Sequence, residues 1–133
     1  MRIISTLIVT LVLCPTSVFA GDEPDCENGS QMELNICAYR DFEKADMELN
    51  MIWPKAKKFA TDGDADLEGN LKGYGKALLA SQRGWLAYRD GNCEVYGFQA
   101  RGGSMESMLV SGCKARMTKE RVKELREMIE FEN

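Results

Sequence analysis

The chain has 133 residues, with 17 lysines and arginines, 21 aspartates and glutamates and no histidine, so its formal net charge at pH 7 is −4. An acidic chain lacks the concentrated positive surface that nucleic acids require, and we expect no nucleic-acid partner. Histidine, the commonest proton carrier and metal ligand, is absent, and no pair of carboxylates stands out from the solvated ones. The sequence therefore favours a protein that is not an enzyme and holds no metal or cofactor.

The first 20 residues have the pattern of a secretory signal peptide. Arg2 supplies a positive start, an apolar run extends from Ile3 to Leu13, and a small-residue ending predicts cleavage after Ala20. The apolar run is shorter than the roughly 20 residues that span a bilayer, so we expect no stable membrane insertion. Cleavage removes one basic and no acidic residue, which leaves 16 basic against 21 acidic residues and a net charge of −5. Residues 21–133 are long enough for one small core, and we expect a single domain.

A long helix is predicted to begin at Ser30. Ser30 and Glu33 have the spacing of a capping box, in which the serine accepts from the amide three residues on and the glutamate reaches back. Apolar residues follow at helical spacing and predict one buried stripe. The stripe consists of Leu34, Ala38, Ala45, Leu49 and Ile52. Because Pro54 removes an amide and crowds the carbonyl of Asn50, we expect the helix to kink or restart near Trp53.

A polar connection, residues 61–70, is predicted to join this helix to an antiparallel second helix that runs from about Leu71 to Arg89. Three glycines weaken the second helix by about 1 kcal/mol each relative to alanine, so packing must hold it. Asp90-Gly91-Asn92 supplies residues that tolerate a left-handed backbone, and we expect the helix to end there.

The segment from Val95 to Gly112 is rich in glycine and is predicted to be a flexible loop with at most a weak helical turn at 104–109. Thr118 is then expected to cap a last helix with an apolar row at Val122, Leu125 and Ile129. Within the loop, Arg101, Gly102, Gly103 and Ser104 are the best candidates for contacting a partner, because glycines allow close backbone approach and the other two offer hydrogen bonds. The alternative is a simple crossover between helices.

Polar residues on the two long helices are predicted to meet in a seam. If these helices pack antiparallel, Asp46 and Asn50 lie level with Arg89 and Trp85. Arg89 is expected to meet Asp46, Gln82 to bond Asn50 or Trp53, and Trp85 to fill the apolar centre. Such buried polar groups specify helix alignment more than they add net stability, so we interpret the seam as structural.

Four cysteines remain after cleavage: Cys26, Cys37, Cys93 and Cys113. An even number in a short exported chain indicates two disulfides, and no paired CxxC spacing favours zinc. Pairing of Cys26 with Cys37 and of Cys93 with Cys113 closes short loops. Antiparallel helices also bring Cys37 near Cys93, so the pairing of Cys37 with Cys93 and of Cys26 with Cys113 stays open.

Seven methionines remain after cleavage and raise the alternative of a copper carrier, because thioethers bind cuprous ion. They are Met32, Met47, Met51, Met105, Met108, Met117 and Met128. Methionine also fills gaps in small irregular cores, and without histidine or a free thiolate we favour packing.

The stretch "CENGSQMELNICAYRDFEKADMELN", followed by "QRGWLAYRDGNC", "GGSM" and "CKARMTKERVKEL", resembles the lysozyme inhibitor LprI-like family of small exported bacterial proteins. The resemblance extends from Cys26 to about Leu125, with Trp53 where the family usually has tyrosine and Gly84 where it usually has alanine. The matching positions are Cys26, Cys37, Asp46, Leu49, Asn50, Gln82, Trp85, Arg89, Cys93, Gly102, Gly103, Ser104, Cys113, Thr118, Arg121 and Leu125.

This resemblance implies an all-α fold, a small helical bundle stapled by disulfides, and inhibition of lysozyme in the periplasm. The expected partner is a basic lysozyme-type glycosidase, toward which an acidic inhibitor is drawn, with Arg101 facing its catalytic carboxylates. The alternatives are an immunity or envelope-stress protein that neutralises another toxin directed at the cell wall, and a family member with another binding function. The sequence gives no oligomeric state.

Overall fold

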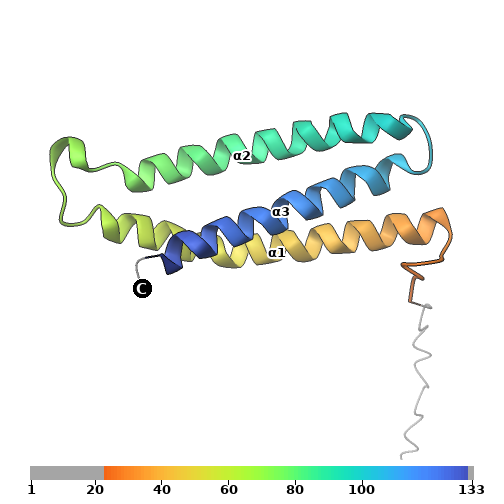
Figure 1. The fold of residues 1–133 in the computed structure, drawn as a ribbon, viewed down its shortest axis with the longest axis horizontal. Coiled ribbons are helices and arrows are strands. Elements are labelled where there is room, and N and C mark those ends of the chain that lie inside the picture. Colours follow the sequence, from red (N-terminus) through yellow and green to blue (C-terminus); the bar gives the residue numbers. More distant parts are fainter. Residues whose placement is uncertain (1–22, 132–133) are drawn as a thin grey trace, which may run out of the picture.

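The computed structural model describes residues 23–131, which contain three long helices, two short 3-10 helices and no strand. The predicted signal peptide lies outside these residues. The helical elements are α1 (Gln31–Gly63), η1 (Gly69–Leu71), α2 (Tyr74–Gly97), η2 (Phe98–Ala100) and α3 (Glu106–Glu130). The chain runs along α1, returns along α2 and runs forward again along α3, so that α2 is antiparallel to both others (Figure 1). The predicted all-α bundle is confirmed.

The start of α1 has the predicted capping box. The amide of Glu33 donates to Ser30 Oγ, and the amide of Ser30 donates to the Glu33 carboxylate at 2.7 Å. Helix α1 does not restart near Trp53, because it continues through Pro54 for two more turns. Leu49 before the proline and Ala56 after it are both buried in the same core. Their shared packing keeps the helix continuous across the missing amide.

Asp64 determines where α2 begins. Its carboxylate accepts hydrogen bonds from the amides of Gly73, Tyr74 and Gly75, at 2.9 to 3.0 Å. These amides have no partner inside the helix, and the three bonds lower the pKa of Asp64. Gly73 has φ +136°, a conformation that needs glycine. The helix therefore starts at Tyr74 and not at Leu71.

The predicted end of α2 at Asp90-Gly91-Asn92 is wrong, because the helix runs on to Gly97. Arg89 and Cys93 are buried on either side of this tripeptide, and their tertiary contacts outweigh its weak helix propensity. Gly97 then packs tightly against α3, where an added Cβ would lie 2.5 Å from Val110 Cγ2.

The predicted flexible loop from Val95 to Gly112 is also wrong, because α3 begins at Glu106. Thr118 does not cap this helix. It lies in the middle of α3 with no exposed surface. Glu106 stabilises the start of α3 by accepting a hydrogen bond from the Gly102 amide. The packing of Val110 on Gly97 stabilises the first turns of the helix.

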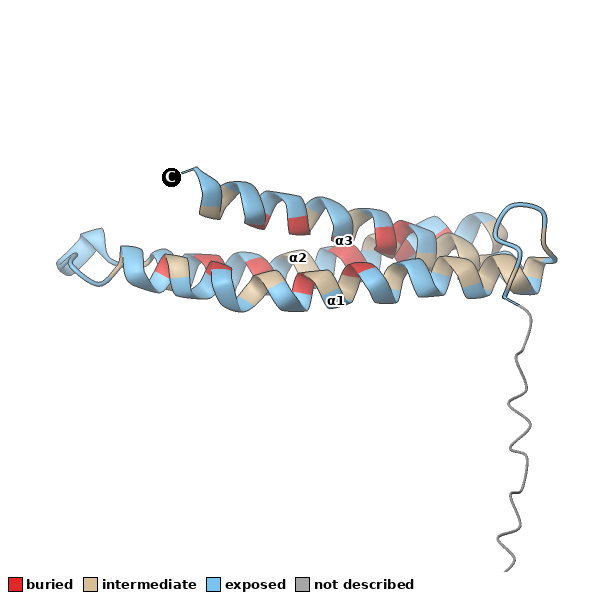
Figure 2. Ribbon diagram, turned by 90° about the horizontal axis from the view of Figure 1, so that it is seen from below, coloured by how far each residue is buried: buried red, intermediate tan, exposed pale blue. Residues whose placement is uncertain are grey.

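The core lies where the three helices meet, in the middle of the bundle (Figure 2). It is formed by Leu49, Ala56, Ala60, Leu78, Val122 and Leu125. Helix α3 packs most extensively on α1, and α1 and α2 contact each other least. The predicted direct pairing of the first two long helices therefore has the right direction, but α3 mediates most of it. No helix in the described part of the chain is long and apolar enough to cross a bilayer.

Candidate functional site

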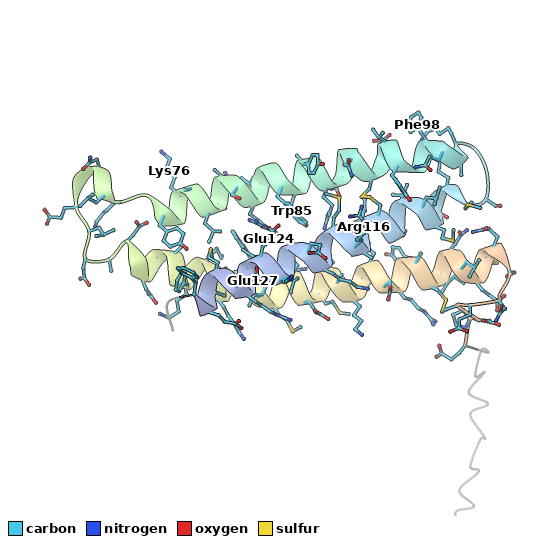
Figure 3. All side chains as sticks on the ribbon, viewed as in Figure 1. Lys76, Trp85, Phe98, Arg116, Glu124 and Glu127 are labelled. Carbon is cyan, nitrogen blue, oxygen red and sulfur yellow. A yellow bond between two sulfur atoms is a disulfide. The ribbon has the colours of Figure 1, made fainter. Side chains whose placement is uncertain are left out.

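Two disulfides brace the same end of the bundle. Cys26 is bonded to Cys37, and Cys93 is bonded to Cys113, with Cα–Cα distances of 5.7 and 5.5 Å. Of the two pairings left open by the sequence, the structure contains the one that closes short loops. The second disulfide joins the end of α2 to the start of α3 and is almost completely buried. It fixes the connection between these helices, which lies at one end of the molecule (Figure 3).

We call this connection, residues 98–105, the hairpin tip. Gly102 has φ +75°, which favours glycine, and the Gly103 amide donates to the Ala100 carbonyl at 2.8 Å. Asn35 of α1 donates from Nδ2 to the Ser104 carbonyl at 3.0 Å. The tip is therefore an ordered turn that is attached to both neighbouring helices. All four predicted contact residues, Arg101 to Ser104, are exposed on it.

Glu106 organises the tip, and sequence reasoning did not single it out. One carboxylate oxygen accepts from the Gly102 amide at 2.7 Å, and the other accepts from Arg101 Nη1 at 2.8 Å. The hydrogen bond from Gly102, with a further contribution from Arg101, lowers the pKa of Glu106. The sequence signal for this role was the position of Glu106, four residues after the first glycine of the Gly102-Gly103 pair. Arg101 therefore has an acidic partner within the chain.

One aromatic side chain of the tip contacts Arg101 on the surface. Its guanidinium lies 4.4 Å from the centre of the Phe98 ring, and Phe98 projects from the end of α2 (Figure 3). Val95, Tyr96 and Met105 are also exposed nearby in the chain. Aromatic, methionine and arginine side chains are the types enriched at the centres of protein interfaces.

An open cleft of about 600 Å³ lies beside the tip, between α1 and the start of α3. It is lined by Asn35, Gly103, Ser104, Glu106, Ser107, Val110 and Ser111, which expose polar and apolar surface alike. Because Asn35 spans from α1 to the tip, the cleft and the exposed tip form one continuous surface. We regard this surface as the candidate binding site.

The seam lies deeper in the bundle and is centred on Arg89. This side chain is 7% exposed and donates from Nη1 to Asp46 at 3.1 Å and to Thr118 at 3.2 Å, and from Nε to Asp90 at 3.0 Å. Its guanidinium also lies 5.2 Å from the ring centre of Trp85 and at the same distance from that of Phe42. The arginine thus joins all three helices.

The structure gives Gln82 a different partner from the expected Asn50 or Trp53. Gln82 Oε1 accepts from Arg121 Nε of α3 at 2.9 Å, while Asn50 donates to Asp46 at 3.2 Å. The seam therefore includes α3, which sequence reasoning left out. Trp85 packs against the core and points toward α3 (Figure 3). Within residues 23–131, every buried side-chain nitrogen and oxygen has a hydrogen-bond partner, so we interpret the seam as a device that aligns the helices.

The expected packing role holds for only some of the methionines, such as Met128, which packs against the core. Met32, Met47, Met51 and Met105 are exposed, whereas the half-buried Met117 places its sulfur 3.6 Å from Cys93 Sγ. The part of the chain that the structure describes contains no group of three or more cysteine, aspartate or glutamate side chains arranged to hold a metal ion.

Two of the comparisons with known proteins give a match in sequence. The family model of the lysozyme inhibitor LprI matches residues 24–125. An uncharacterized protein of Rhizobium meliloti (strain 1021) is 48% identical over 128 residues, which cover 92% of each chain. No solved structure matches. The match spans both disulfides, the seam and the hairpin tip, and the chain belongs to the lysozyme inhibitor LprI family.

Proposed function

We propose that this protein is a periplasmic inhibitor that binds a basic lysozyme-type glycosidase through its hairpin tip. Membership of the lysozyme inhibitor LprI family supports a protein partner of this class. The predicted signal peptide and the two disulfides support export to an oxidising compartment. The observation that carries the proposal is the cluster of exposed aromatic, methionine and arginine side chains on a turn that a buried disulfide fixes.

The order of the tip favours tight binding. Association costs free energy when a loop or side chain must be immobilised, and a turn that is already fixed avoids most of this cost. Phe98 and Met105 supply apolar surface, and Arg101 supplies a charge that its stacking on Phe98 already orients.

The positive charge of Arg101 is complementary to the carboxylates of a glycosidase cleft. Such enzymes carry a pair of carboxylates on either side of the scissile bond. In the free inhibitor, Arg101 pairs with Glu106 on the surface, where water screens an ion pair and leaves it worth little. In a closed cleft the same guanidinium pairs with the enzyme's carboxylates at lower dielectric. Glu106 stays bound to the Gly102 amide and preserves the turn.

The negative charge of the mature chain supports a basic target. A net charge of −5 attracts a positively charged enzyme and speeds the encounter, and added salt screens this attraction. Inhibition is therefore expected to weaken as the ionic strength rises.

The test is the rate at which a basic lysozyme clears a cell-wall suspension in the presence of residues 21–133. We expect a dose-dependent fall in rate at low salt, and roughly tenfold weaker inhibition when Phe98 and Arg101 are both replaced by alanine. Replacing Arg83 and Tyr88 by alanine, also an arginine and an aromatic residue exposed on α2, is the matched control and leaves inhibition unchanged.

The two measurements test separately whether this enzyme is inhibited and whether the hairpin tip is the binding surface. An unchanged clearing rate at saturating protein refutes inhibition of that enzyme. If the double variant at the tip and the control variant both inhibit as well as the wild type, the protein is an inhibitor. The tip is then not its binding surface.

A further inference from the structure

One side of α1 carries a row of exposed apolar residues. Met32, Ile36, Tyr39, Met47 and Met51 follow one another at spacings of three, four and eight residues, which places them along one side of the helix. Their exposure ranges from 37% at Ile36 to 73% at Met32. We call these five residues the outer stripe.

The outer stripe has no partner within the described bundle, because the residues that α1 buries lie on another side of the helix. Those residues include Ala45, Leu49, Ala56 and Ala60, which belong to the core. Glu43 interrupts the row, four residues from both Tyr39 and Met47. The exposed side of a helix in a monomer is normally polar, and an apolar row on either side of one glutamate indicates an interaction surface.

A hollow of about 390 Å³ adjoins the outer stripe. It is lined by Tyr39, Phe42, Glu43, Asp46 and Met47. The first four of these occupy positions i, i+3, i+4 and i+7, which is the arrangement of the four residues that form a hole for the side chain of a facing helix. The hollow therefore offers a place for one side chain of a second helix laid along α1.

The charges at the two ends of the stripe differ in sign. Along the chain, acidic residues precede the stripe and basic residues follow it: Glu23, Asp25 and Glu27 before it, and Lys55, Lys57 and Lys58 after it. A parallel pair of such helices sets like charges against each other. An antiparallel pair brings each acidic end against a basic end, and the dipoles of the two antiparallel helices also attract each other.

We propose that the outer stripe of α1 binds the same stripe of a second copy of this chain, with the two helices antiparallel. The contact is then two-fold symmetric, and the same patch serves both subunits. Glu23 pairs with Arg40, which lies between Tyr39 and Met47, and Lys58 pairs with Asp62. Both pairs are exposed, so replacing them by pairs with a second copy costs little free energy. This dimer leaves the hairpin tip free and stands whether or not the protein inhibits a glycosidase.

Sedimentation equilibrium of residues 21–133 tests the dimer. We expect a dimer with a micromolar dissociation constant, since a single helix pair is at the small end of specific interfaces. Replacing Ile36 and Met47 by glutamate is expected to raise this constant roughly 100-fold, because four carboxylates then meet in the interface. Tyr88→Glu on α2 is the control, an equally exposed site away from the stripe, and leaves the constant unchanged.

Charge exchange tests the antiparallel direction. Lys55→Glu with Lys58→Glu, or Glu23→Lys with Glu27→Lys, sets like charges at both ends and is expected to weaken the dimer about tenfold. The fourfold variant restores complementary ends and recovers the wild-type constant. A wild-type chain that stays monomeric up to about 200 μM, or an Ile36 and Met47 double variant that dimerises normally, overturns the proposal. Equal affinity in all charge variants overturns the antiparallel direction.

Discussion

Replacing Arg89 by lysine is expected to destabilise the protein strongly although the charge is kept. Arg89 donates from two different nitrogens to three oxygens on α1, α2 and α3, and its planar head lies 5.2 Å from the centres of two aromatic rings. A lysine ammonium is a point charge that cannot reproduce this fork or stack flat on a ring.

The size of the effect follows from the contacts that are lost. Lysine keeps at most one of the three hydrogen bonds, and each lost bond costs about 1 kcal/mol net. Loss of the two ring contacts costs a further 0.5 to 1 kcal/mol or so each. Because the side chains of Asp46 and Asp90 are 38% and 51% exposed, water compensates part of this loss. We expect the free energy of unfolding to fall by about 2 to 3 kcal/mol.

Urea unfolding with the disulfides intact measures this change, with tryptophan fluorescence as the signal, since Trp53 and Trp85 pack against the core. A change of this size also lowers the melting temperature by roughly 10 °C in a domain of this length. Arg83→Lys, at an exposed site on the same helix, is the matched control and is expected to change stability by less than about 0.5 kcal/mol. If Arg89→Lys also changes the free energy of unfolding by less than about 0.5 kcal/mol, the seam does not hold the helices together as we infer.

Two further predictions concern the hairpin tip. Since the folded pKa of Glu106 is lowered, its carboxylate stabilises the tip above the ordinary glutamate pKa of about 4.3, and this stabilisation is lost as the pH falls through the lowered folded value. The NMR shift of the Gly102 amide should follow the same titration and lose its pH dependence in Glu106→Gln, whereas an unchanged titration in that variant argues against the hydrogen bond. Replacing Cys93 and Cys113 by serine, with the other disulfide intact, should lower the free energy of unfolding by about 3 kcal/mol for a loop of this length, which urea unfolding measures. A loss below about 1 kcal/mol would show that packing alone fixes the end of α2 against α3.

The tip and the outer stripe divide the surface between two proposed roles. The tip lies at the end of the α2–α3 hairpin, while the stripe runs along the side of α1. A dimer built on the stripe therefore presents two tips, and antiparallel α1 helices direct them toward opposite ends of the assembly.

The sequence by itself determined the features that depend on local chemistry. The capping box of Ser30 and Glu33 and the helical spacing of apolar residues require only neighbouring residues, and both are present in the structure. The ion pair between Asp46 and Arg89 also followed from the expected direction of two helices.

Only the tertiary structure decided the features that distant residues control. Asp90-Gly91-Asn92 favours a helix end, yet burial of Arg89 and Cys93 on either side keeps α2 helical, since packing free energy exceeds a propensity penalty of about 1 kcal/mol per residue. Thr118 has the residue type of a cap but serves as a buried acceptor for Arg89, because α3 starts three turns earlier at the turn that Glu106 holds. Local sequence sets preferences of this size, and the burial of side chains from three helices in one core overrides them.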